Sequence, residues 1–596
     1  MKILGISMGF NSSAALMIDG KIVAAQQEER FNRIKNYDTW PGKAIDSCLK
    51  IANISRKELD AVVWAGKDPG PPEYFLTKRY CSFSLKDMVD EQYNFWYPEM
   101  YKNKKIDFLK LYKSKIDLKQ KPGKKFLNKV KKNYQNPKGL SLMHEIKYEL
   151  VKKELGIARN KVFFEEHHEC HAYYSVSKFI NVKKNILVFT LDGSGDKGIN
   201  CTVSIFRNRK LKRLFSTKNF ILGRIYRHIT LLLGMKWGEH EYKTMGLAPY
   251  STKYHSDGPF EIFNKTLKII NPKNVKQNLK DCYFYFIKPL SRYRFDGIAQ
   301  GVQRFAEEKI LKWFKLWINK TKIYDICYSG GVSMNVKANQ EASKIKKVNS
   351  FNVMGSGTDD SLSIGACYSF ASKHENNIEP LNHLYLGYEI NEKEINHKIK
   401  KLNKKKFKII KKPTNLFFAK LLKRGLILGR CKGKMEFGSR ALGNRSILAD
   451  PTSSETIKRI NEKIKSRDFW MPFAPSVLDN CSKKYFSIKK KIDYTQMTVC
   501  VDTKEYFKNK IPAVLHPADK TARVHVVKKE NNPDYYHLIS CFKKVSGYGV
   551  VLNTSLNLHG KPIVRNVDDC LEVLTNSEID GILIENYLIL KRENNA

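Results

Sequence analysis

Two histidines lie four residues apart in the stretch FFEEHHECH, at His167 and His171. Residues four apart share one face of a helix. Two neutral imidazoles on one face can hold a divalent metal, as the histidine pair of H-E-x-x-H does. His168 is a competing partner for His171, because a spacing of three also brings helical side chains together. The alternative is a solvated surface cluster, in which both histidines lie among acids: Glu165, Glu166 and Glu169.

A carboxylate follows this cluster about twenty residues later, in the turn LDGSGD. Asp192 comes directly after the apolar run 185–191, which we interpret as a buried strand. A hard oxygen ligand at the end of that strand can complete a mixed nitrogen and oxygen metal site. The two motifs together therefore favour a metal centre over a surface cluster.

Glycine-rich turns follow predicted strands at four places, and their backbone amides can cradle phosphates. The first is the loop 9–13, the second is LDGSGD, the third is YSGGVSMNV and the fourth is GSGTDDSLSIGA, which carries Asp359. We assign nucleotide binding to residues of the second and third turns: Gly193, Gly195, Gly330, Gly331 and Asn335. This repeated plan predicts an α/β body built like the actin-like ATPases, from two duplicated halves around a nucleotide.

A second polar block begins beyond a looser region near 375–382, and we place a domain boundary at 378/379. Arginines on glycine-flexed loops beside hydroxyl and amide side chains suit the bidentate binding of a phosphate and of a small planar group. We assign the chemistry of this block to Arg440, Arg467 and His516, and ligand binding to Lys432, Arg445, Lys465, Arg523, Asn553, Ser555 and Asn557.

Composition narrows the class of protein. The 596 residues carry 42% hydrophobic side chains and a formal net charge of +48, typical of a folded protein of two to four domains with a strong field for anions. The alternative for the charge is a compositional bias carried on solvated faces. Residues 101–135 carry thirteen lysines, within an insertion at about 70–145. The charges of EERFNRIKN, residues 28–36, are interpreted as too dense for a core.

The sequence also indicates in which cellular compartment the protein is expected. The twelve cysteines are scattered singly, which is typical of a reducing compartment. Neither a signal peptide nor an apolar run long enough to span a membrane is visible. We therefore expect a cytoplasmic protein.

The motifs together resemble a known family, the O-carbamoyltransferases of the nodulation and antibiotic-tailoring type (NodU/CmcH type). The matching stretches keep the family's order over about nine-tenths of the chain: SAALMIDGKIVAAQQEERFNRIK, EHHECHA, LDGSGD, EYKTMGLAPY, YSGGVSMNV, GTDDSLSIGA, MEFGSRALGNRSILADP, MPFAPSV, HPADKTARV and LNTSLNLHGKPIV. The resemblance implies an actin-like N-terminal domain, 1–378, and a YrdC-like α/β C-terminal domain, 379–596.

The resemblance also implies a reaction. In this family the C-terminal domain forms carbamoyl-adenylate from carbamoyl phosphate and ATP, and the N-terminal domain transfers the carbamoyl group to a substrate hydroxyl beside an iron-type metal. It implies Fe²⁺ on His167, His171, Asp192 and Asp359, Mg²⁺ with the ATP, and an adenylate site on Lys465, Arg467, Ser555 and Asn557. The acceptor is expected to be a sugar, glycan or other small molecule.

Phe10 departs from the family pattern. Family members usually carry histidine there and aspartate at the position of Asn11. Phenylalanine cannot move a proton, so Lys35, Asn11 or the substrate must cover that role. Ser361 and Lys561 are lesser departures, at positions where glycine and glutamate are common.

Two alternative functions stay open. One is a nucleotide-binding relative that has lost transfer, and the other is an RNA-modification factor. We expect no stable nucleic-acid complex, since no RNA-recognition module is visible. An anionic membrane surface and a second copy of the chain are candidate partners.

Overall fold

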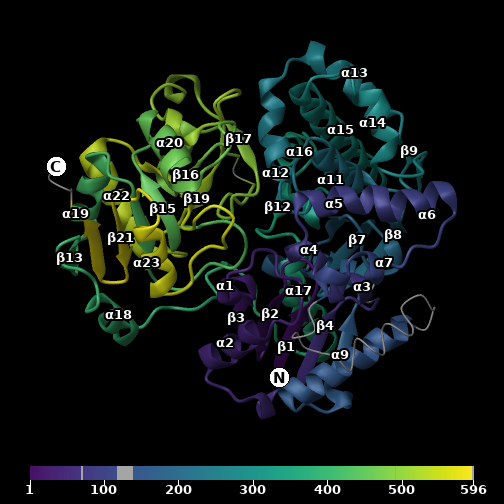
Figure 1. The fold of residues 1–596 in the computed structure, drawn as a ribbon, viewed down its shortest axis with the longest axis horizontal. Helices are drawn as coiled ribbons and strands as arrows, with labels where there is room; N and C mark the ends of the chain where they lie inside the picture. The colour runs from purple at the N-terminus through teal and green to yellow at the C-terminus, as the bar shows by residue number, and fades with distance from the viewer. Residues whose placement is uncertain (69–71, 117–138, 490, 593–596) are drawn as a thin grey trace. The chain divides into compact units, whose positions relative to one another are not determined.

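The computed structural model describes residues 1–68, 72–116, 139–489 and 491–592 (Figure 1). The chain forms two compact units. The first contains Met1–Glu29 and Ile34–Leu381, and the second contains Arg30–Arg33 and Asn382–Ala596. All of residues 1–378 were predicted to form one domain, whereas Arg30–Arg33 belongs with the second unit.

The first unit begins with a five-stranded mixed sheet. Its order is β3-β2-β1-β4-β5, with β1, β2 and β3 antiparallel and β1, β4 and β5 parallel. The expected hairpin at Asp19-Gly20 is present, because both residues have positive φ, as a type I′ turn requires. The strands are β1 (Lys2–Ser7), β2 (Ser13–Ile18), β3 (Lys21–Gln27), β4 (Ala61–Ala65) and β5 (Val162–Glu165).

A second sheet of the same unit repeats this topology. Its order, β8-β7-β6-β11-β12, has the same pattern of antiparallel and parallel pairs. The prediction of duplicated α/β halves is therefore confirmed. The strands are β6 (Ile186–Leu191), β7 (Cys201–Arg207), β8 (Lys210–Thr217), β11 (Asp325–Ser329) and β12 (Ser350–Val353).

Two helices join the halves at the centre of this unit. Helix α17 (Leu362–His374) packs on β1 and β4, and helix α10 (His167–Val176) packs on β11 and β6. The two helices also pack on each other, and glycine makes this close approach feasible. A Cβ on Gly365 would lie 2.0 Å from the carbonyl oxygen of Cys170. Both helices begin beside predicted metal ligands.

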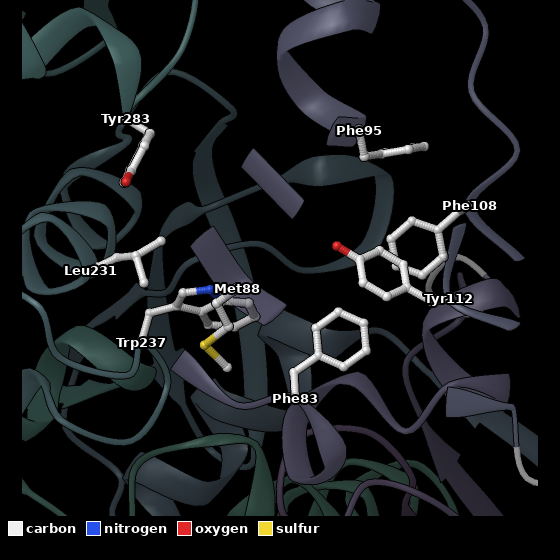
Figure 2. Close-up of a cluster of buried hydrophobic side chains, with 8 residues drawn as sticks. All are labelled: Phe83, Met88, Phe95, Phe108, Tyr112, Leu231, Trp237 and Tyr283. Atoms are coloured by element: carbon white, nitrogen blue, oxygen red, sulfur yellow. The ribbon is translucent and has the colours of Figure 1, made fainter. Parts of the chain in front are cut away.

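The insertion folds as short helices against the body of the first unit. Helix α5 (Leu85–Glu91) packs on α11 (Leu222–Leu232), and buried side chains of both regions form one apolar cluster. Figure 2 shows Phe83, Phe108 and Tyr112 gathered on one side of this cluster, with Met88, Leu231 and Trp237 on the other. The other short helices are α3 (Pro72–Leu76), α4 (Arg79–Ser82), the π-helical turn Gln92–Trp96, α6 (Tyr97–Lys102) and α7 (Phe108–Leu111). Seven of the thirteen lysines fall in 117–138, outside the described residues.

The second unit is built on an eight-stranded mixed sheet with the order β13-β22-β21-β14-β15-β20-β16-β19. The α/β class predicted for it is confirmed. The strands are β13 (Phe407–Lys411), β14 (Leu428–Cys431), β15 (Arg445–Ala449), β16 (Ala474–Leu478), β19 (His525–Val527), β20 (Val550–Ser555), β21 (Gly581–Ile584) and β22 (Tyr587–Lys591). Helices α19 (Asn415–Lys423) and α22 (Pro533–Ser546) pack on each other, and β17 (Cys500–Asp502) pairs with β18 (Thr521–Arg523).

One sequence-based interpretation is wrong. The charges of residues 28–36 were excluded from the core, yet Glu28, Glu29 and Arg30 are 4%, 6% and 1% exposed. Backbone groups satisfy them: Glu28 accepts from the amide of Ala44 and Glu29 from that of Asn36, at 2.8 and 2.9 Å. Burial raises the pKa of Glu28 to about 7. The density of charges in a sequence therefore does not show whether a segment is buried, because backbone groups can pair with those charges.

Two further expectations concern the whole chain. All twelve cysteines are free, so no disulfide framework is present. No helix among the described residues is both long and apolar enough to cross a membrane.

The packing of the insertion can be tested at Phe108, which is 1% exposed in the apolar cluster. Phe108→Ala should lower the free energy of unfolding by about 3–5 kcal/mol, because it removes a buried ring and leaves a cavity. Leu111→Ala is the matched control on the same helix. Leu111 is 39% exposed, so this change should stay within about 0.5 kcal/mol. Urea unfolding measures both, and equal losses would show that the insertion is not docked by this cluster.

Candidate functional site

Helix α10 presents both predicted histidine ligands at its first turns. The helix starts directly after β5, and the side chain of Glu166 caps it by accepting from the amide of Glu169 at 2.8 Å. The side chain of His171 is fully buried, and that of His167 is 12% exposed. The expected helical face is therefore present, and it points inward.

Asp192 and Asp359 converge on these histidines from two different turns. Nε2 of His167 lies 3.0 Å from Oδ2 of Asp192 and 3.7 Å from Oδ1 of Asp359. Nε2 of His171 lies 3.6 and 3.5 Å from the same two oxygens. All four candidate ligand atoms lie within 4.8 Å of one another. Residues 192 apart in sequence thus form one cluster, as predicted.

The donor set fits a divalent cation. Ligands about 2.1 Å from a metal are separated from each other by roughly 3.0–3.4 Å, close to the spacing seen here. Neither ring nitrogen of His171 makes a hydrogen bond with any described residue, although the ring is buried. Two imidazoles and two carboxylates are the mixed set that iron-type and other first-row metals accept. Together with His167 and Asp192, His171 and Asp359 could therefore hold the metal.

Charge balance points the same way. Burial alone would lower the pKa of His167, but the hydrogen bond to Asp192 and the charge of Asp359 raise it to about 9. Burial alone would raise the pKa of Asp192, but the hydrogen bond from His167 and the charges of His167 and His171 hold it well below its usual range. The two carboxylates therefore attract positive charge to this cluster.

His168 is not a member of the cluster. Its Nδ1 lies 2.7 Å from the hydroxyl of Thr190, and its Nε2 lies 2.9 Å from the carbonyl oxygen of Ile199. Both ring nitrogens are thus used to hold α10 against β6 and the following turn. This resolves the choice between the 167/171 and 168/171 pairs.

The predicted nucleotide turns surround the same cluster. The amide of Gly331 donates to Oδ1 of Asp192 at 3.1 Å, and Gly330 has φ +95°, which a side chain would strain. A Cβ on Gly195 would lie 2.6 Å from the ring of His167, whereas Gly193 has no contact closer than 3.9 Å. Gly193 alone of these leaves room beside its backbone. Asn335 instead caps α16 (Val336–Ser343) by accepting from the amide of Ala338 at 3.0 Å.

Asp196 is a site residue that the sequence analysis missed. Its carboxylate accepts from the amides of Lys67, Asp68 and His167, at 2.8, 3.0 and 2.9 Å. It therefore fixes the start of α10 relative to the loop after β4. The signal was present, since Asp196 is the second acid of LDGSGD, but nothing in the spacing separates a capping acid from a ligand.

The first glycine loop carries Phe10 and Asn11. The ring of Phe10 makes an edge contact with Tyr80, 5.5 Å between centroids, so it packs on the insertion. Asn11 has φ +55° and is 6% exposed. Its Oδ1 is buried without a hydrogen-bond partner among the described residues, which leaves an acceptor available to a ligand.

Lys35 is a fixed cation. Its Nζ lies 2.8 Å from Oε1 of Glu239. Burial alone would lower the pKa of Lys35, but the charges of Glu239 and Tyr242 raise it above its ordinary value. The pKa of Glu239 falls to about 2 under the charge of Lys35, despite its own burial. Lys35 can therefore neutralise an anion, but it is a poor general base.

In the second unit, the two adenylate signatures meet. Nζ of Lys465 donates to Oδ1 of Asn557 at 2.6 Å, to its carbonyl oxygen at 3.0 Å, and to the carbonyl oxygen of Ser555. The hydroxyl of Ser555 donates to Oδ1 of Asn557 at 2.6 Å. Lys465 is 3% exposed. Its ammonium group thus shapes the loop after β20.

Three arginines lie close together near this loop. Burial, then the like charges of Arg440 and Arg467, lower the pKa of Arg523 well below its usual range. Nε of Arg523 is buried without a hydrogen-bond partner among the described residues. Guanidinium groups that repel one another are stabilised by an oxyanion between them. This cluster is the candidate oxyanion site of the second unit.

Other predicted binding residues are held by protein groups. The guanidinium of Arg445 is buried and donates to the carbonyl oxygens of Gly433, Asn444 and Tyr388. Nζ of Lys432 lies 2.9 Å from Asp534.

Asn553 and His516 are also engaged. The amide of Asn553 donates to Ala441 and Ser476, and Nδ1 of His516 accepts from the amide of Ala518 at 3.2 Å in the turn before β18. For Arg445, Lys432 and Asn553 these contacts favour a role in shaping the loops around the arginines.

Comparison with known proteins places the chain among the transferases. The family model described as Carbamoyltransferase N-terminus matches residues 2–368, and the model described as Carbamoyltransferase C-terminus matches residues 419–591. The chain therefore belongs to the carbamoyltransferase family, and its relatives are of the NodU/CmcH type.

Three relatives illustrate the range of similarity. An uncharacterized protein of Methanocaldococcus jannaschii is 30% identical, covering 99% of this chain and 99% of the relative. The nodulation protein NolNO of Sinorhizobium fredii is 25% identical, covering 98% of this chain and 79% of the relative. The 3'-hydroxymethylcephem-O-carbamoyltransferase of Amycolatopsis lactamdurans is 33% identical over 161 residues, 27% of this chain and 30% of the relative.

The metal site can be tested by titration with Co²⁺ as a coloured probe. We expect one ion per chain, and His171→Ala should lower the affinity by more than about 100-fold, since removal of a mere supporting residue already costs roughly 10- to 100-fold. Calorimetry measures the affinity, and visible absorption reports the nitrogen and oxygen ligands. Glu169→Gln is the matched control on the same helix, because Glu169 contacts Ser369 and Lys373 and not the cluster. Equal affinities in the two variants would exclude this site.

Proposed function

We propose that this chain is an O-carbamoyltransferase that works in two steps at two sites. The second unit forms carbamoyl-adenylate from carbamoyl phosphate and ATP, and the first unit passes the carbamoyl group to a hydroxyl of a sugar or natural product. The observation that carries the proposal is the His167, His171, Asp192 and Asp359 cluster at the glycine turns of a duplicated α/β unit. Membership of the carbamoyltransferase family supplies the group that is transferred.

The arginine cluster of the second unit suits the first step. Carbamoyl phosphate is a small dianion, and the triphosphate of ATP adds further charge, which Mg²⁺ would share. Arg440, Arg467 and Arg523 supply positive charge close together, since the charges of Arg440 and Arg467 both lower the pKa of Arg523. Guanidinium groups bind such oxyanions through paired donors.

The first step consumes carbamoyl phosphate, water and ATP. Water takes the carbamoyl group from carbamoyl phosphate, which releases orthophosphate and leaves a carbamate. A carbamate oxygen then attacks the α-phosphorus of ATP, the bond to the β-phosphate oxygen breaks, and pyrophosphate leaves with the electron pair. The product is carbamoyl-adenylate. Pyrophosphate release without any acceptor is therefore the signature of this step.

In the second step, the acceptor hydroxyl attacks the carbamoyl carbon, and the bond to the phosphate oxygen of AMP breaks. A divalent cation held by the His and Asp cluster would supply Lewis-acid polarisation of the carbonyl. Oδ1 of Asn11 can accept from the incoming hydroxyl and orient it. Lys35 stays protonated beside Glu239 and compensates negative charge.

The hydroxyl proton needs a destination, and Phe10 cannot provide one. The phosphate of the departing AMP can, because a phosphate monoester has a pKa of about 6. The mixed anhydride is already activated, so the proton can leave late, after the carbon–oxygen bond has formed. The substrate thus covers the role that a histidine at position 10 would have.

A second candidate is a relative that binds nucleotide but no longer transfers the group. The packing of Phe10 on Tyr80 favours it, because the ring turns this position into part of an apolar contact. This candidate predicts ATP binding with no release of pyrophosphate.

The two candidates separate in a pyrophosphate assay with carbamoyl phosphate and ATP and without acceptor. Wild-type protein should release pyrophosphate, and Arg467→Ala should slow the release by roughly 100-fold or more, as loss of one charge-stabilising donor does. Arg459→Ala is the matched control, because Arg459 pairs with Asp580. Its rate should match wild type. No release from wild-type protein that still binds ATP would instead support the non-catalytic relative.

A further inference from the structure

Arg227 lies on α11 beside the turn that carries the metal ligand Asp192. A Cβ placed on Gly193 would lie 3.9 Å from Nη1 of Arg227, so the guanidinium faces this turn. Its carbon lies 4.6 Å from the centre of the Trp237 ring, which it covers. Gly193 is also the glycine with open space at its backbone. A cation therefore borders the open side of Gly193 in the LDGSGD turn.

The Arg227 guanidinium has no ion pair among the described residues, and its Nε is buried without a hydrogen-bond partner there. The neighbouring acids are committed elsewhere. Glu91 holds Arg79 through two hydrogen bonds of 2.7 and 2.5 Å. Oε1 of Glu241 accepts from the amide of Gly238 at 2.6 Å.

The surroundings of Arg227 disfavour its charged form. Burial, then the like charges of Arg79 and Arg224, lower the pKa of Arg227 against the opposing influence of Tyr80 and of the nearby Glu241 carboxylate. The ring of Trp237 contacts a second guanidinium group, because that of Arg79 lies 4.4 Å from the ring centre. A partly buried cation without an ion pair is unfavourable, and an oxyanion ligand relieves the penalty.

An aromatic wall continues from Trp237 towards the first glycine loop. Tyr80 makes edge contacts with Trp237 and with Phe10, at 5.7 and 5.5 Å between centroids. Low-polarity walls strengthen a charged hydrogen bond beside them, because they exclude water. Tyr80 belongs to the insertion, so this chain's own insertion completes the surroundings of Arg227.

We propose that Arg227 binds an oxyanion, a phosphate or a carboxylate, beside the His and Asp cluster of the first unit. The inference rests on the proposed function and deepens it, since it names a group that the ligands of the transfer site carry. Two sources share this chemistry. One is the phosphate of the adenylate, and the other is an acidic group on the acceptor. A guanidinium takes either group through paired donors.

The experiment uses the full-length chain with Arg467→Ala and Arg523→Gln, which removes the oxyanion site of the second unit. Orthophosphate, AMP and adenosine are titrated by calorimetry into this background and into the same background carrying Arg227→Gln. Arg224→Gln is the matched control, because Arg224 is exposed on the same helix three residues away. Loss of Arg227 should weaken orthophosphate binding at least tenfold, and loss of Arg224 should change it less than twofold.

The titration with AMP shows which molecule carries the oxyanion. If Arg227→Gln weakens AMP as strongly as orthophosphate and leaves adenosine unchanged, the oxyanion is the phosphate of the adenylate. If orthophosphate weakens and AMP does not, the oxyanion belongs to the acceptor.

Orthophosphate binding that is equal in Arg227→Gln and Arg224→Gln overturns the inference. Arg227→Lys keeps the charge but not the paired donors, so it should weaken orthophosphate severalfold even if the glutamine variant fails to fold. If Arg227 binds no oxyanion, the wild-type protein is still expected to release pyrophosphate. The failure of this inference and that of the proposed function are therefore distinguishable.

Discussion

The contact between helices α10 and α17 is the constraint on which the first site depends. Gly365 lets α17 approach the backbone of Cys170 in α10, and Gly5 lets β1 approach the backbone of Ser363 in α17. A side chain at either glycine would place its Cβ 2.0 Å from a carbonyl oxygen. Because the helices start where the sheets end, this packing brings the histidines of one half beside the aspartate that precedes the other helix. The candidate metal centre is a consequence of how the duplicated halves pack.

Both candidate sites contain charged groups that the protein itself does not fully neutralise. In the first unit, the carboxylates of Asp192 and Asp359 converge on two imidazoles, of which that of His171 is buried without a hydrogen-bond partner among the described residues. In the second, Arg523 is half-buried, with a buried Nε, beside two like charges. Arg79, by contrast, is paired with Glu91. Unpaired buried charge is costly in a folded protein, so its concentration at these places indicates ligands of the opposite sign.

The sequence predicted the parts whose physics is local. The Asp19-Gly20 hairpin, the helix that carries His167 and His171, and the strand before Asp192 all follow from turn chemistry and periodicity. Roles that depend on partners distant in the chain were not predictable. In the sequence Arg445 resembles a ligand-binding residue, yet its guanidinium donates its hydrogen bonds to backbone carbonyl oxygens. Arg227 belongs to no sequence motif. Glu28 and Glu29 were taken for surface because their backbone partners cannot be read from composition.

Phe10 shows how the insertion and the chemistry are connected. A histidine in this loop would need a polar partner to fix its ring, whereas Phe10 needs an apolar one and finds it in Tyr80. Tyr80 is held in turn by Asp38, whose carboxylate accepts from its backbone amide at 2.8 Å, and by the packing of its ring on Trp237. The insertion that supplies Tyr80 thus stabilises a loop without a proton-transfer group. The activated carbamoyl donor of the proposed function would tolerate such a loop, since its leaving phosphate could take the proton itself.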